Sequence, residues 1–178
     1  QWLAWELGIK YQLKRIGPRT GQTLTPEYRA INPRHKIPAM THGNLVLTES
    51  VAIMIYLTEI FPAPEFFHVP QTIIARNKLL EWCFFLMSEI DANALYTIRR
   101  HGALKAIYGD SSVAVDAAGE YFNHQIETME KPLKNAGKFL MGKQISVADI
   151  LFVTCLDSAI RYNLPLPDYL LSYHKRLT

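Results

Sequence analysis

The residues best suited to chemistry lie in two short segments, Ile37-Pro38 and Thr48-Glu49-Ser50. Pro38 interrupts an apolar run with the pattern of a β-strand, and proline has no N–H to donate to a strand ladder. If the Ile37-Pro38 bond is cis, the backbone N–H and C=O of Ile37 remain unpaired and could pair with an extended peptide. The alternative is an edge-strand proline that only prevents aggregation.

The second segment lies where a predicted hairpin ends and a helix begins. A helix N-terminus offers free N–H groups and a partial positive charge, so it can bind a carboxylate. The Ser50 hydroxyl adds a donor and Glu49 can pair with an ammonium group, which together suit the zwitterionic head of an amino acid. Alternatively, Thr48 or Ser50 only caps the helix. Taken together, the two segments predict a binding site for a short peptide.

The elements that position these segments form a small α/β domain, which we assign to residues 1–61. The hydrophobic patterns, caps and turn residues predict these elements in chain order: a helix over Trp2–Leu7 ended by Gly8, a strand over Lys10–Ile16, a short helix over Pro26–Ala30, strands over Ile37–Met40 and Leu45–Leu47 joined as a hairpin, and a helix over Glu49–Ile60. The domain begins in mid-helix without a preceding strand, so we expect the natural chain to start upstream of Gln1 and to continue past Thr178.

A proline-rich linker at residues 62–70 separates this domain from an all-α helical-bundle domain at residues 71–178. The apolar spacing predicts one helical segment of about 30 residues that ends near Gly102. It then predicts helices over Ser112–Lys131 and Val147–Tyr162, and a short helix after Pro167.

Composition narrows the classes of function. The chain has 178 residues, 49% of them hydrophobic, and a net charge of +3 without a basic stripe, so we expect a globular protein that binds no nucleic acid. The longest apolar runs are far shorter than a membrane span, and no signal peptide is recognisable. Cys83 and Cys155 fit buried free thiols, which points to a reducing cytoplasm. We expect no metal site.

Two further patterns occur in the helical domain. Ser146 and Asp149 fit a capping box, with Ile145 and Ile150 as its hydrophobic staple, and Asp149→Ala should cost about 1 kcal/mol or more of stability. The polar residues of the long helical segment recur at helical spacing, so they line either a cleft or a solvated stripe: Glu89, Asn93, Tyr96 and Arg100.

The segment NPRHKIPAMTHGNLVLTESVAIMIYL resembles the second half of the thioredoxin-like domain of cytosolic glutathione S-transferases, in a bacterial-type form whose class stays open. The segment FLMGKQISVADILF resembles the N-capping motif in the helical core of that family. The resemblance covers essentially the whole chain. It implies the glutathione S-transferase fold, with an incomplete thioredoxin-like domain followed by the helical domain, and glutathione as co-substrate.

The resemblance also implies roles for residues. Those expected to bind glutathione are Ile37, Pro38, Glu49, Ser50, Lys36 and His35, although for the last two a solvated basic edge is an equal alternative. Those expected to border the pocket for a small hydrophobic electrophile are Asn93, Tyr96 and Arg100. The apolar helix over Val51–Leu57 suggests burial against a partner, and we expect a homodimer.

The resemblance places the catalytic Ser, Tyr or Cys at the end of a strand before Gln1, so the catalytic residue of this chain is unknown. The first hypothesis is a glutathione transferase that conjugates the thiolate to electrophiles. A glutathione-dependent thiol reductase or peroxidase and a non-catalytic binding or scaffold protein are the alternatives, and the Glu49-Ser50 pair argues against the last.

Overall fold

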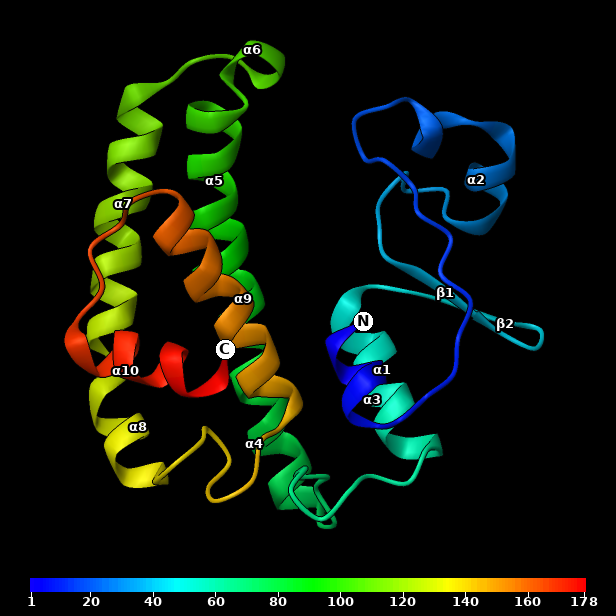
Figure 1. The fold of residues 1–178 in the computed structure, drawn as a ribbon. Coiled ribbons are helices and arrows are strands. Elements are labelled where there is room, and N and C mark those ends of the chain that lie inside the picture. Colours follow the sequence, from blue (N-terminus) through cyan, green and yellow to red (C-terminus); the bar gives the residue numbers. More distant parts are fainter. The chain divides into compact units, whose positions relative to one another are not determined.

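The chain divides after Pro64, inside the predicted linker, and the computed structural model describes residues 1–178 as two units, Gln1–Pro64 and Glu65–Thr178. Figure 1 traces both units along the chain. No helix in either unit combines the length and the apolar character needed to cross a membrane.

The first unit is built around the predicted hairpin. Strands β1 (Ala39–His42) and β2 (Leu45–Thr48) are antiparallel, and their register runs from Ala39 opposite Thr48 to His42 opposite Leu45. Gly43 takes the positive φ of 58° that the tight turn requires. The helix α3 (Ser50–Ile60) follows directly. The remaining elements of this unit are α1 (Trp2–Glu6), η1 (Gln22–Leu24) and α2 (Pro26–Ile31).

The predicted strand over Lys10–Ile16 is wrong, because these residues form no regular element. The two-stranded sheet contains only β1 and β2, so no strand within residues 1–178 lies beside this segment. A strand is defined by hydrogen bonds to a neighbour, and an alternating pattern alone cannot supply one.

The second unit is entirely helical, as predicted. Its elements are α4 (Ile73–Phe84), η2 (Phe85–Leu95), α5 (Tyr96–Ile98), η3 (Arg99–Ala103), α6 (Lys105–Tyr108), α7 (Ser112–Glu127), α8 (Glu130–Ala136), α9 (Val147–Arg161) and α10 (Asp168–Leu177). The predicted helix over Ser112–Lys131 is interrupted at Thr128 and Met129, where the chain turns from α7 into α8.

The segment predicted as one long helix runs without a break from α4 to η3 (Figure 1). Its parts η2 and η3 are wound as π-helix, with wider turns than the α-helical parts. Both η2 and α4 pack against α9, and η2 also packs against α7. The side chains at the centre of this packing are fully buried: Leu86, Ile90, Phe122, Phe152 and Leu156.

The predicted capping box is present at the N-terminus of α9. The Ser146 N–H and hydroxyl donate to Asp149 Oδ2 at 2.8 and 2.6 Å. The other carboxylate oxygen of Asp149, Oδ1, accepts hydrogen bonds from the Leu140 N–H at 2.8 Å and from the Tyr173 hydroxyl. Asp149 is 0% exposed, so these donors replace the water that the carboxylate loses on burial.

Candidate functional site

The Ile37-Pro38 peptide bond is cis, as predicted. The β1–β2 ladder begins at Ala39, so Ile37 lies outside it and its side chain is 44% exposed. No hydrogen bond of the chain reaches the N–H or C=O of Ile37. One donor and one acceptor of the backbone are therefore available to a ligand.

The hairpin register brings the two candidate segments to the same end of the sheet. Ala39 opposite Thr48 is the last pair of the ladder, so Pro38 and Glu49 are the next residues on the two strands. Directly opposed residues in an antiparallel pair lie about 5 Å apart. A ligand that reaches the Ile37 backbone therefore lies close to the start of α3.

The N-terminus of α3 is not capped by a side chain. Glu49 occupies the N-cap position and makes no side-chain cap hydrogen bond, so the alternative in which Thr48 or Ser50 caps the helix is wrong. The first intrahelical bond joins the Ile53 N–H to the Glu49 carbonyl at 3.0 Å. The preceding N–H groups of the helix thus have no intrahelical partner and point out of its positive end.

Glu49 has an unusual backbone conformation, with φ of 71° and ψ of 124°. Residues other than glycine seldom adopt a positive φ, and such positions cluster at functional sites. The conformation turns the chain sharply between β2 and α3 and leaves the carboxylate exposed at the helix start.

The loop before Pro38 is braced by two side chains that the sequence interpretation missed. The Tyr28 hydroxyl and the Asn32 Nδ2 both donate to the Lys36 carbonyl, at 2.6 and 2.8 Å. Asn32 Oδ1 also accepts the Arg34 N–H at 3.0 Å, and Asn32 is 1% exposed. These bonds hold the backbone immediately before Ile37. The Asn-Pro pair at residues 32 and 33 was part of the recognised motif, but nothing in its spacing indicated this role.

Arg34 is the third residue that sequence interpretation does not identify, although it stands in the same basic run as His35 and Lys36. Its Nη2 donates to Thr48 Oγ1 at 2.6 Å, and its Nε lies 3.5 Å from Glu49 Oε1. Both charged side chains are mostly exposed, at 63% and 68%, so the ion pair contributes little to stability. Arg34 positions the Glu49 carboxylate without burying it.

His35 and Lys36 lie beside this loop in different environments. His35 has a positive φ of 57°, and its Nδ1 lies 3.0 Å from the Thr23 carbonyl. Because a carbonyl only accepts, Nδ1 carries a proton. The Lys36 side chain is exposed.

The polar residues of the long helical segment form two contacting pairs. Asn93 Nδ2 donates to Glu89 Oε2 at 3.3 Å, and the Arg100 guanidinium carbon lies 5.9 Å from the centre of the Tyr96 ring. Glu89 also accepts the hydroxyl of Tyr121 on α7, and these hydrogen bonds lower the pKa of Glu89. Glu89 is thus engaged within the bundle, whereas Asn93 and Arg100 are exposed.

Both units of the chain match domains of one known protein family. Residues 1–60 match the family described as "Glutathione S-transferase, N-terminal domain", and residues 100–178 match "Glutathione S-transferase, C-terminal domain". The chain belongs to the glutathione S-transferase family.

Two relatives illustrate where the chain lies in this family. It is 32% identical to the probable maleylacetoacetate isomerase 1 of Drosophila melanogaster over 84% of its length and 58% of that protein. It is 27% identical to human glutathione S-transferase theta-1 over 82% of its length and 61% of that protein. The chain therefore spans about three fifths of the length of these relatives.

Solved structures share the fold. Human glutathione S-transferase T1-1, in its apo form, matches 98% of the chain with a TM-score of 0.85 and 24% identity, over 75% of that protein. Human glutathione transferase theta-2, in complex with glutathione, matches 99% with a TM-score of 0.87 and 23% identity, over 74% of that protein. These values establish the glutathione S-transferase fold, with a thioredoxin-like unit followed by a helical unit.

Proposed function

We propose that this protein is a glutathione transferase, which binds glutathione beside the hairpin and conjugates its thiolate to small hydrophobic electrophiles. The observation that carries the proposal is the meeting, at one end of the β1–β2 ladder, of the unpaired Ile37 backbone and the uncapped start of α3. Family membership and the glutathione bound to human theta-2 support it.

Each part of glutathione has a partner of fitting chemistry in this arrangement. The cysteinyl residue pairs its backbone with the N–H and C=O of Ile37, in the manner of an added strand. The γ-glutamyl carboxylate binds the Ser50 hydroxyl and the N–H groups of α3, and its ammonium binds Glu49. The glycyl carboxylate lies beside Lys36, with His35 as a weaker candidate.

The ion pair between Arg34 and Glu49 is compatible with this binding mode. An exposed pair is worth about 0–1 kcal/mol, so the Glu49 carboxylate can turn toward a ligand ammonium at small cost. Arg34 also keeps its hydrogen bond to Thr48 when Glu49 turns.

The reaction joins two molecules at the sulfur of glutathione. A thiol has an ordinary pKa of about 8.5, so little thiolate exists at neutral pH and the protein has to stabilise it. The thiolate then attacks an electrophilic carbon, and a C–S bond forms. We propose that the electrophile binds along the long helical segment, beside Asn93, Tyr96 and Arg100.

The two cysteines within residues 1–178 are not suited to serve as the catalytic thiol. Cys83 and Cys155 are both free and buried. Burial raises the pKa of Cys83 to about 11 and also raises that of Cys155, so neither is a ready thiolate. Buried free thiols also fit the proposed cytoplasmic location.

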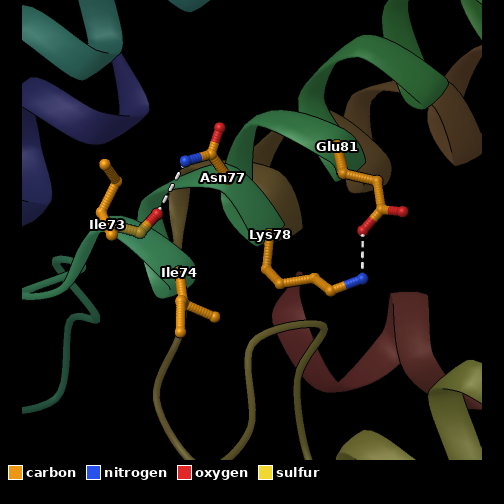
Figure 2. Close-up of a pocket in the computed structure, with 5 residues that line it drawn as sticks. All are labelled: Ile73, Ile74, Asn77, Lys78 and Glu81. Atoms are coloured by element: carbon orange, nitrogen blue, oxygen red, sulfur yellow. Dashed lines mark hydrogen bonds and ion pairs between the residues drawn. The ribbon is translucent and has the colours of Figure 1, made fainter.

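We further propose that the protein is a homodimer. Helix α3 is apolar, yet only Thr58 in it is buried. On α4, Ile73, Ile74 and Phe84 are 77%, 75% and 69% exposed, and such apolar side chains in one helix indicate a contact surface. Figure 2 shows the open groove at the start of α4, which is lined by Ile73, Ile74, Asn77, Lys78 and Glu81.

Calorimetric titration with glutathione tests the proposed binding site. Glu49→Ala and Ser50→Ala should each weaken glutathione binding at least about tenfold, because each removes a group that binds the charged γ-glutamyl head. The matched controls Glu127→Ala and Ser172→Ala alter exposed residues of the second unit and should leave the affinity unchanged. Wild-type affinity in both site variants would refute the assignment.

A further inference from the structure

Arg100 lies in a basic stretch of the helical unit and has no acidic partner there. Residues 92–109 contain no Asp or Glu but carry Arg99, Arg100, His101 and Lys105. Within this unit no ion pair joins Arg100 to a carboxylate, and its side chain is exposed.

The neighbouring basic residues are each engaged. Lys105 Nζ lies 3.0 Å from Asp110 Oδ2. The positive charge of Arg99 acts on Asp91, where it opposes the rise in the pKa of that carboxyl caused by burial. His101 Nδ1 donates to the Gly109 carbonyl at 3.0 Å. Arg100 is thus the member of the cluster whose charge remains available to an anion.

Two aromatic rings hold the Arg100 side chain. Its guanidinium carbon lies 4.8 Å from the centre of the Tyr108 ring and 5.9 Å from that of Tyr96. Cation–π contacts of this kind restrict the side chain but leave its charge without an anionic acceptor. The entropy lost on binding a ligand is smaller when the arginine is already held in place.

The wide turn of η3 and the short helix α6 bring Tyr108 to Arg100. The Leu104 N–H donates to the Arg99 carbonyl at 2.8 Å, which closes the π-helical turn. The Gly109 N–H donates to the Lys105 carbonyl at 2.9 Å, and Gly109 has a φ of 91° that ends α6. The position of the second ring therefore follows from the backbone as well as from its contact with arginine.

We infer that Arg100 selects electrophiles that carry a carboxylate, which it binds while the apolar body of the electrophile lies against Tyr96 and Tyr108. This inference rests on the proposed glutathione transferase function and names the substrate class of its second site. The planar guanidinium fits a carboxylate with two parallel hydrogen bonds.

A matched pair of aryl chlorides suits the reaction. One is a chloronitrobenzoate with chlorine para to the carboxylate and nitro ortho to the chlorine, and the other is the corresponding neutral benzamide. The glutathione thiolate attacks the carbon that bears chlorine. The C–S bond forms, the C–Cl bond breaks, and chloride leaves with the electron pair, so no oxidant or reductant is required.

The test measures binding, so it does not depend on turnover. The glutathione conjugates of the benzoate and of the benzamide are titrated into the protein by calorimetry, alongside glutathione itself. The wild type should bind the benzoate conjugate about tenfold more tightly than the benzamide conjugate. Arg100→Gln should abolish that preference and leave the affinity for glutathione itself unchanged.

Two further variants serve as controls. Arg100→Lys keeps the positive charge and should retain part of the preference, which separates loss of charge from loss of packing. Lys105→Gln removes a cation from the same stretch and should change the preference less than twofold, because Lys105 already faces Asp110.

The possible outcomes separate the two proposals. Normal glutathione binding with equal affinity for both conjugates, or an unchanged preference in Arg100→Gln, overturns the role of Arg100 and leaves the transferase proposal intact. Failure to bind glutathione overturns the proposed function and, with it, the inference that rests on it.

Discussion

The environment of Asp149 explains why a carboxylate is buried at this position. A fully buried carboxylate accepts the N–H groups of Leu140 and Ser146 and the hydroxyls of Ser146 and Tyr173. It thereby joins the loop before α9, the first turn of α9 and the helix α10. Its role is structural, because its bonds lie inside the helical unit.

Asp149→Ala should lower the free energy of unfolding by about 3 kcal/mol, because it leaves several buried donors without an acceptor. This is more than the roughly 1 kcal/mol expected for the loss of a cap alone. Urea unfolding measures the change, and glutathione affinity in the folded fraction should stay at the wild-type value. Asp116→Ala, at an exposed position on α7, is the control and should stay within about 0.5 kcal/mol. Equal stability of the two variants would contradict this account.

The burial of Tyr173 should make the folded protein less stable in alkaline solution. Burial, and then the charge of Asp149, raise the pKa of Tyr173 above the ordinary value of about 10. In the unfolded chain the phenol ionises first, so its contribution to stability is complete below pH ~10 and falls as the pH rises further. Tyr173→Phe should be less stable at neutral pH but should lose stability less steeply above pH ~10. Urea unfolding across this pH range measures the free energy of unfolding of the wild type and of Tyr173→Phe. If the two values fell in parallel as the pH rises, the prediction would be wrong.

At the scale of the element, the loop from Asn32 to Pro38 depends on side chains that precede it. Asn32→Ala removes one of two donors to the Lys36 carbonyl and the acceptor of the Arg34 N–H. Glutathione affinity should fall several-fold, because Ile37 is then held less firmly. Tyr28→Phe removes the other donor and should have a smaller effect.

Calorimetric titration measures both variants. Asn77→Ala is the matched control, since that amide bonds only within the first turn of α4, to the Ile73 carbonyl at 2.8 Å. A loss of affinity in Asn77→Ala equal to that in Asn32→Ala would show that the loop has no special role.

The elements that were predicted correctly are those whose signals are local. The hairpin has Gly43 in its turn, α2 begins with proline, and α9 has a capping box, and each of these signals acts within a few residues. The strand over residues 10–16 failed because pairing needs a second strand. The π-helical turns of η2 and η3 were not predicted, because an apolar pattern does not distinguish them from α-helical turns.

The same distinction applies to the candidate site. The cis bond and the helix start followed from residue types at fixed positions, Pro38 and Glu49-Ser50. The roles of Tyr28, Asn32 and Arg34 depend on side chains that reach a loop from another part of the unit. Such hydrogen bonds have no periodic signal in a sequence.

At the scale of the whole molecule, the exposed apolar side chains of α4 predict self-association. Replacement of both Ile73 and Ile74 by Glu should shift the protein from dimer to monomer, because each carboxylate would lose its water at the interface. Sedimentation velocity measures the change. Val113→Glu is the control, since Val113 is 79% exposed on α7, and it should leave the dimer intact. A wild-type protein that sediments as a monomer at micromolar concentration would contradict the proposal.

The bonding of Asp149 also makes two amide hydrogens useful as probes. The N–H groups of Leu140 and Ser146 belong to no helix or strand, a setting in which exchange with deuterated solvent is ordinarily fast. Here both residues are buried, at 4% and 0% exposure, and both amides donate to the same carboxylate. Their exchange therefore requires an opening that also frees α9 and α10, so two loop amides should be protected as strongly as the helical core.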